Sequence, residues 1–207
     1  MESASRQAHW ENVYATKGES EVSWFQENPA PSLELIAQAG AVGTSAIIDI
    51  GGGASRLVDH LVEQGFADIT VLDLSGSALE AARRRLGSRA PRVHWVVADV
   101  TSWEPAKPYD LWHDRAAFHF LTDESDRAAY IARLARGLKM GGHAIIATFA
   151  PDGPEKCSGL PVARYDSASL ARTLGPTFQP VRTLRHTHAT PWGSQQAFQF
   201  SVFRREG

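Results

Sequence analysis

The sequence predicts an α/β domain in which a mostly parallel sheet carries helices on both faces. Short apolar runs rich in β-branched residues alternate with segments of helical periodicity along most of the 207 residues. The run 46–50 leads directly into three glycines, as a buried strand does where it turns into a helix. Two final strands are joined by a short turn containing Pro191 and Gly193, so one of them is predicted to be antiparallel.

The first half of the chain alternates between the two kinds of element. Helices are predicted at 6–16 and 32–40, before the first strand at 46–50. The next helix places Leu57 and Leu61 on one face and ends at Gly65. A second strand at 69–74 precedes a helix that Gly87 ends.

The second half continues the alternation and then changes to a hairpin. Strands are predicted at 93–98, 109–113, 143–149, 178–186 and 195–204. Helices are predicted at 124–138 and 166–174. The run Met140-Gly141-Gly142 forms the turn into strand 143–149, and the loop 151–162 is too rich in glycine and proline to be helical.

Composition limits the functional classes. The chain is 43% hydrophobic and 21% charged, with a net charge of -2, so broad binding to nucleic acid is not expected. A single cysteine excludes an internal disulfide framework. The polar start at Met1-Glu2-Ser3 shows no secretory signal, and no apolar run approaches membrane-spanning length. We therefore expect a cytoplasmic protein with no membrane partner.

The glycine turn indicates a nucleoside-containing cofactor. Gly51 and Gly53 match the first two glycines of a dinucleotide fingerprint, but Arg56 occupies the position of the third. Asp49 adds negative charge beside the turn, which suits a cationic amino-acid tail better than a pyrophosphate. Asp73 ends the next strand, where a parallel sheet presents an acceptor to ribose hydroxyls.

These residues resemble the motifs of a known family. The run from Asp49 to Gly53 resembles the first motif of the class I S-adenosylmethionine-dependent methyltransferases. The run Val97-Ala98-Asp99-Val100 resembles the motif of their third strand, and 139–143 resembles the approach to their fifth. The resemblance spans about residues 10–204. It implies a Rossmann-like, seven-stranded methyltransferase fold with S-adenosylmethionine as cofactor.

The resemblance also implies a set of cofactor-binding residues. Asp73 would bind the ribose and Asp99 the adenine amino group, although an Asp at this position also commonly caps a turn. Leu74 and Val100 would enclose the purine. The full set is Asp49, Gly51, Gly52, Gly53, Asp73, Leu74, Asp99, Val100 and Trp24.

A polar cluster follows the strand at 109–113. His113, Asp114 and Arg115 are predicted to be catalytic residues, because the end of this strand lies beside the methyl group in the family's fold. The run Asp114-Arg115-Ala116-Ala117 partly resembles the thiopurine and metalloid methyltransferase branch. The alternative is an internal ion network between Asp114 and Arg115 that holds the loop.

Other segments are expected at the same rim. His119, Cys157, Trp192 and Gln195 are predicted to contact the substrate, and no metal is expected because no ligand spacing supports one. The predicted organisation is a single domain, 1–207. It has an aromatic lid at 1–40, a cofactor-binding core at 46–150, and a substrate loop and hairpin at 151–207.

The predicted function is transfer of a methyl group to a small-molecule nucleophile such as a thiol or a metalloid. Proximity and orientation would carry most of this catalysis. A protein-lysine methyltransferase is the enzymatic alternative, with a protein substrate bound near Trp24, Trp192 and Asp114. A noncatalytic module that binds S-adenosylmethionine is the other alternative.

Overall fold

The computed structural model describes residues 3–207, with side chains from residue 5 onward, and has the predicted α/β architecture. Within these residues, seven strands form one sheet in the order β3-β2-β1-β4-β5-β9-β8. The strands of this sheet are β1 (Ala46–Ile50), β2 (Asp68–Asp73), β3 (Val93–Val97), β4 (Tyr109–Arg115), β5 (Leu138–Phe149), β8 (Phe178–Ala189) and β9 (Gln195–Arg205). Only β9 runs antiparallel to its neighbours, which confirms the predicted hairpin.

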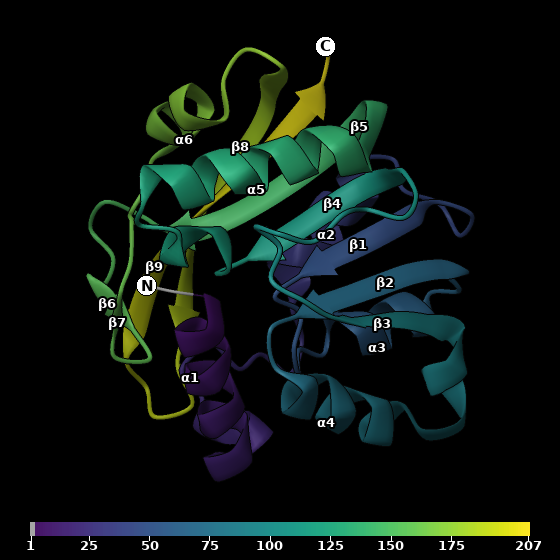
Figure 1. Ribbon diagram of the computed structural model, residues 1–207, viewed down its shortest axis with the longest axis vertical. Coiled ribbons are helices and arrows are strands. Elements are labelled where there is room, and N and C mark those ends of the chain that lie inside the picture. Colours follow the sequence, from purple (N-terminus) through teal and green to yellow (C-terminus); the bar gives the residue numbers. More distant parts are fainter. Residues whose placement is uncertain (1–2) are drawn as a thin grey trace.

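The helices cover both faces of the sheet, as predicted. The α-helices are α1 (Ser3–Thr16), α2 (Ala30–Gln38), α3 (Leu57–Glu63), α4 (Gly76–Leu86), α5 (Glu124–Gly137) and α6 (Ser167–Leu174). Three short 3-10 helices are η1 (Glu19–Glu21), η2 (Gly87–Arg92) and η3 (Phe118–Phe120). Figure 1 shows α5 crossing in front of the sheet, with α2 and α3 behind it. Among residues 3–207, no helix combines the length and apolarity that crossing a membrane requires.

Two apolar cores result from the alternation of side chains along each strand. Ile47 points to the face covered by α2, α3 and α4, whereas Ile48 points to the face covered by α5 and α6. In β5, Ile145 and Ile146 divide in the same way. All five residues of β1 are buried, as expected for a central parallel strand covered on both sides.

The structure differs from the predicted elements in two places. Strand β5 begins at Leu138, because the predicted turn around Gly141 is an irregularity within the strand, where the register against β4 shifts. The loop after β5 contains an unpredicted hairpin of β6 (Lys156–Cys157) and β7 (Leu160–Pro161). Its turn residues Ser158 and Gly159 both have positive φ, as the tightest hairpin turns require.

The strand order places one crevice at the centre of the sheet. From β1 the chain proceeds to β2 and β3 on one side, and then returns to β4 on the other. Open α/β sheets bind ligands at such a switch point, outside the carboxyl ends of the strands. The residues after β1 and β4 therefore occupy the expected binding position.

Candidate functional site

A cavity opens at the carboxyl ends of the central strands. Leu72, Asp73 and Leu74 line it from β2 and the turn after it, and Asp99 and Val100 line it beyond β3. It encloses about 780 Å³ of space, its open mouth included. Most of these predicted cofactor-binding positions therefore converge on one space.

The glycine turn after β1 forms one wall and requires glycine for two reasons. Gly51 has φ +65, and a Cβ there would lie 2.7 Å from the Cβ of Ala117. Gly53 has φ +45, and a Cβ there would lie 2.9 Å from Oδ2 of Asp73. A side chain at either position would be strained and would collide with its neighbour. The turn thus forms a cradle that leaves the Asp73 carboxyl group accessible.

Asp73 is buried in this cradle. Its Oδ1 accepts a hydrogen bond of 2.8 Å from the backbone N–H of Ser75. Burial raises the pKa of Asp73 to about 7, and the nearby carboxylates of Asp49 and Glu11 act in the same direction. The geometry suits an acceptor for ribose hydroxyl groups.

Asp99 already has partners from the protein. Its Oδ1 accepts hydrogen bonds from the backbone N–H and the hydroxyl of Thr101, at 2.9 and 2.7 Å. Its Oδ2 accepts one of 2.9 Å from Arg6 of α1, which also pairs with Asp126. Asp99 therefore combines the predicted turn-capping role with an ion pair to the N-terminal helix.

The N-terminal aromatic side chains enclose the cavity. Trp10, Tyr14 and Trp24 all line it, and Trp24 Nε1 donates a hydrogen bond of 3.2 Å to the Tyr14 hydroxyl. The Trp10 ring meets those of Trp24 and Phe120 at centroid distances of 5.7 and 5.0 Å. The predicted lid segment therefore contacts the predicted cofactor site in this structure.

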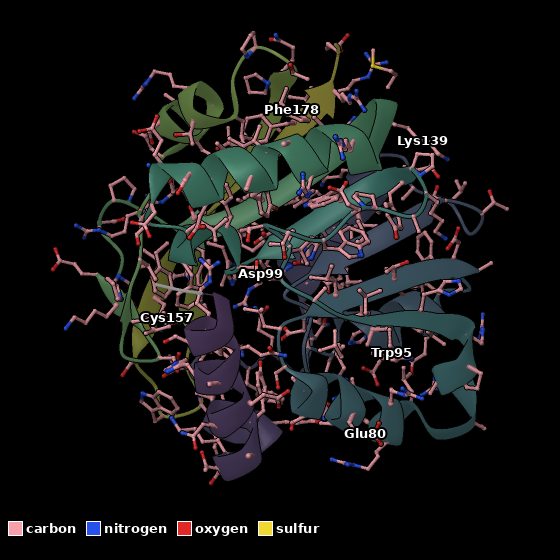
Figure 2. The ribbon with its side chains drawn as sticks, viewed as in Figure 1. Glu80, Trp95, Asp99, Lys139, Cys157 and Phe178 are labelled. Atoms are coloured by element: carbon pink, nitrogen blue, oxygen red, sulfur yellow. The ribbon has the colours of Figure 1, made fainter. Side chains whose placement is uncertain are left out.

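Helix α1 is held against the site by polar contacts. Glu11 accepts hydrogen bonds from the backbone N–H groups of Gly76 and Ser77 at 2.7 and 3.2 Å, and from the Ser75 hydroxyl at 3.0 Å. These groups lie at the N-terminus of α4, where a carboxylate is stabilised. Figure 1 shows α1 beside α4, and Figure 2 shows Asp99 and Cys157 on either side of the end of α1 in that view.

Sequence reasoning missed Arg6, Glu11 and Ser32. A signal for Arg6 was present, because Arg6, Trp10 and Tyr14 are spaced by four residues and so share one helical face. All three line the cavity.

His113 supports Asp49 in a second cavity next to the glycine turn. Its Nδ1 lies 2.7 Å from Oδ1 of Asp49, and its Nε2 lies 2.9 Å from the Ser32 hydroxyl. Both ring nitrogens are therefore engaged with protein groups. His113, predicted to be catalytic, instead orients the carboxylate that the resemblance assigns to the cofactor's amino-acid tail.

Asp114 points to the opposite face of β4 and is fully buried. Its oxygens accept hydrogen bonds from the backbone N–H groups of Ala117 and Phe118 and from the Tyr130 hydroxyl. Burial raises the pKa of Asp114 to about 6. It does not line either cavity at the carboxyl edge, so the structure gives it a structural role in place of the predicted catalytic one. The predicted ion network between Asp114 and Arg115 is absent from the described residues as well.

Arg115 lines both cavities. Its Nη1 donates a hydrogen bond of 2.9 Å to the Trp24 carbonyl, and its guanidinium carbon lies 4.8 Å from the centroid of the Phe198 ring. Of the three residues predicted to be catalytic, Arg115 has the clearest access to a ligand.

Two predicted substrate residues lie near the cavity but differ in access. Cys157 lines it, and burial raises the pKa of its thiol to about 11, so the thiol is protonated at neutral pH. His119 is buried outside the cavity lining, where it accepts a 3.4 Å hydrogen bond from the Phe149 N–H. Burial, with a contribution from Arg115, lowers the pKa of His119 to about 3. His119 is therefore a neutral core residue in this structure, not a substrate contact.

The structure does not bring Trp192 and Gln195 to the cavity. Trp192 lies in the turn between β8 and β9 with 60% of its surface exposed, and Gln195 is also exposed. The hairpin contacts the N-terminal segment through His188, whose Nε2 donates a hydrogen bond of 2.7 Å to the Ser23 carbonyl. Neither residue lines the cavity in this structure, so contact of Trp192 and Gln195 with a substrate stays a prediction. In the described part of the chain, no cluster of His, Cys, Asp or Glu could hold a metal ion.

Residues 47–142 match a family model described as a methyltransferase domain. The chain is 31% identical over 187 residues to a trans-aconitate 2-methyltransferase of Rhizobium leguminosarum bv. trifolii, covering 90% of this chain and 60% of the relative. It is 24% identical over 151 residues to the eEF1A lysine and N-terminal methyltransferase of Bos taurus, covering 69% of this chain and 21% of the relative. The chain thus spans less than two thirds of the length of these relatives.

Solved structures show the same fold. The N-methyltransferase NodS from Bradyrhizobium japonicum, in complex with S-adenosyl-L-homocysteine, has a TM-score of 0.72 at 17% identity and covers 99% of both chains. The 1,6-didemethyltoxoflavin-N1-methyltransferase of Burkholderia thailandensis has a TM-score of 0.69 at 21% identity, covering 99% of this chain and 85% of that one. The family match, the relatives and the order of the strands thus agree in a resemblance to the class I S-adenosylmethionine-dependent methyltransferases, and residues 47–142 carry the match to the methyltransferase domain.

Proposed function

We propose that this protein transfers a methyl group from S-adenosylmethionine to a small-molecule acceptor. The observation that carries the proposal is the cavity in which Asp73, Asp99 and the glycine turn meet beneath the N-terminal aromatic residues. The bound cofactor supplies a methyl group on a cationic sulfur. The acceptor would supply the electron pair of the new bond to carbon, and sulfur would keep the pair of the carbon–sulfur bond that breaks.

The residues of the cavity fit this cofactor. Asp73 is placed to accept hydrogen bonds from ribose, and Leu74 and Val100 offer apolar surface to a purine. Asp49 lies in the adjoining cavity, where its negative charge suits an amino group. Tyr14 and Trp24 line both cavities, and aromatic faces attract cations. The aromatic lid would exclude water from the reacting groups.

The environment favours an acceptor that arrives as an anion. His113 is bonded to Asp49 and Ser32, and Asp114 is bonded to backbone groups and Tyr130. Neither is placed to remove a proton from an acceptor. An ionised acceptor needs no base, so orientation beside the methyl group is sufficient.

Among ionised acceptors, we propose a carboxylic acid ahead of a thiol or a metalloid. The relatives named for trans-aconitate support this choice. The lysine alternative has support from the eEF1A methyltransferase relative. It is disfavoured by Arg115, since a half-buried guanidinium in the cavity wall repels a lysine ammonium group.

The test is an acceptor panel analysed by mass spectrometry. The protein is incubated with S-adenosylmethionine and, separately, with trans-aconitate and other short carboxylic acids, thiols, arsenite and lysine peptides. We expect a methyl ester of a carboxylic acid. Methylation of a thiol or a peptide alone would contradict the choice of acceptor. A protein that binds the cofactor but methylates nothing in the panel would favour the noncatalytic alternative.

A further inference from the structure

Arg115 has two hydrogen-bond donors that no described residue satisfies. Its Nη1 is bonded to the Trp24 carbonyl, but Nε and Nη2 are both buried without a partner in the described part of the chain. These two nitrogens lie on the same outer edge of the guanidinium, with parallel N–H bonds. This edge receives both oxygens of a carboxylate in side-on pairing.

The charge of Arg115 is also unbalanced. Among the described residues, no carboxylate forms an ion pair with it, whereas the buried Arg6 pairs with both Asp99 and Asp126. Burial lowers the pKa of Arg115 to about 10, so the group stays cationic at neutral pH. A cation that lacks a counter-ion and whose Nε and Nη2 donors are buried is costly to the fold.

Nearby groups neither balance the charge of Arg115 nor accept hydrogen bonds from its Nε and Nη2. Asp49 attracts Arg115 without forming an ion pair with it. The Asp49 carboxylate is instead paired with His113. The Cys157 thiol is protonated at neutral pH, since burial raises its pKa to about 11. The Phe198 ring covers one face of the guanidinium but leaves its edge free.

We propose that Arg115 binds a ligand carboxylate through Nε and Nη2 and is thereby a specificity-determining residue of the site. This inference rests on the proposed function for the identity of the ligands. Arg115 lines both cavities, so the carboxylate has two sources. One is the amino-acid tail of the cofactor beside the glycine turn, and the other is the acceptor.

The experiment compares ligands that differ by a carboxylate, in variants that differ by one charge. S-Adenosylhomocysteine and 5′-methylthioadenosine share the adenosine, but only the first carries the amino-acid tail. Succinate and succinamide provide the same contrast for the acceptor, titrated into protein saturated with S-adenosylhomocysteine. Binding is measured by calorimetry for the wild type, Arg115→Gln and Arg115→Lys. The control is Arg185→Gln, which removes an exposed arginine paired with Asp152.

If the cofactor tail is the ligand, Arg115→Gln should lose roughly ten- to hundredfold in affinity for S-adenosylhomocysteine, but not for methylthioadenosine. If the acceptor is the ligand, affinity for S-adenosylhomocysteine stays and binding of succinate is lost. Arg115→Lys should rescue either loss only in part, because an ammonium group cannot reproduce the two parallel N–H donors of a guanidinium. The Arg185→Gln control should match the wild type throughout.

The proposal would be overturned if Arg115→Gln bound both S-adenosylhomocysteine and succinate as tightly as the wild type does. A wild-type protein that binds neither S-adenosylhomocysteine nor methylthioadenosine would contradict the proposed function. Succinate and succinamide would then be titrated into the free protein, and Arg115-dependent binding of succinate would still support this inference. If Arg115→Gln does not fold, the Nε–H resonance of Arg115 in ¹⁵N-arginine-labelled wild type decides. It should shift with a carboxylate ligand and not with the matched neutral one, and no shift with either carboxylate ligand would overturn the proposal.

Discussion

At Asp73, folding favours the protonated carboxyl group, whereas binding of a hydrogen-bond donor favours the ionised one. Its carboxyl group is buried near Asp49 and Glu11, and burial is the main reason that its pKa rises to about 7. A ligand that donates hydrogen bonds to Asp73 would stabilise the ionised form. Without a ligand, the folded protein with ionised Asp73 is thus less stable than it would be with a neutral side chain at this position.

The pH dependence of the free energy of unfolding should show how much the ionised Asp73 destabilises the fold. In the unfolded chain Asp73 titrates near 3.9. Its contribution to the free energy of unfolding is therefore full below about pH 4 and falls as the pH rises to about 7. The whole change is on the order of 4 kcal/mol. Asp73→Asn should gain stability relative to the wild type between about pH 5 and pH 8, measured by denaturant unfolding at each pH.

Asp110 provides the matched control. Its side chain is partly exposed, and hydrogen bonds from Lys139 and the Ala46 N–H lower its pKa despite some burial. Its stabilising effect is present above the unfolded pKa and is lost only as the pH falls toward the folded one. Asp110→Asn should therefore show a constant difference from the wild type over the same interval. A constant difference for Asp73→Asn too would contradict the raised pKa.

Asp114 should be needed for folding, not for chemistry. Asp114→Ala would leave the N–H groups of Ala117 and Phe118 and the Tyr130 hydroxyl without their buried acceptor. We expect a loss of roughly 3–5 kcal/mol and a fall in Tm of about 10 °C, measured by calorimetry. A folded variant with the wild-type Tm and no methyl transfer would instead restore the catalytic prediction.

At the scale of elements, α1 is attached mainly by specific polar contacts. Arg6 pairs with Asp99 in the cavity wall, and Glu11 bonds to the N-terminus of α4. Val13 is its buried aliphatic residue, while Trp10 is only half-buried. A helix attached in this way can separate from the sheet without exposing a large apolar core. The division into a lid at 1–40, a core at 46–150 and a substrate part at 151–207 remains a prediction, and residues 1 and 2 lie outside the described residues.

Release of the polar contacts should speed the loss of ligand. In the double variant Arg6→Gln and Glu11→Gln, we expect S-adenosylhomocysteine to dissociate roughly tenfold faster, because the open state of the lid becomes more populated. Stopped-flow fluorescence would follow it, since Trp10 and Trp24 line the cavity. The control is Arg89→Gln, which removes an exposed ion pair with Glu63. An unchanged dissociation rate with normal folding would mean that α1 is not a lid.

At the scale of the whole molecule, the fold could be predicted because its signals are local. Buried apolar runs, the glycine turn and the final hairpin each lie within a few residues of sequence, and together they determine the sheet. The early start of β5 could not be predicted. The residues around Gly141 suggest a turn, but pairing with β4 and β9 draws the segment into the sheet.

The location of a candidate site residue could be predicted where its place at the end of a strand decides that location, and its role stays a prediction. Asp73 and Asp99 follow strand ends, so parallel strands bring them to one edge. The cluster of His113, Asp114 and Arg115 lies within the end of β4, and the sequence prediction did not apply the alternation of side chains along a strand to it. His113 and Arg115 share one face, and Asp114 points to the other. Their partners Ser32, Trp24 and Tyr130 come from distant segments that no local pattern reveals.

The assignment of this cavity to S-adenosylmethionine is tested most directly by a calorimetric titration of the wild type and Asp73→Ala with S-adenosylhomocysteine. We expect micromolar binding to the wild type. We expect a loss of about 1–3 kcal/mol in the variant, since one buried, charge-assisted hydrogen-bond acceptor is removed. The Tm of each protein, measured without ligand, shows that both are folded. No binding to the wild type, or equal affinity in the two proteins, would contradict the assignment of this cavity to S-adenosylmethionine.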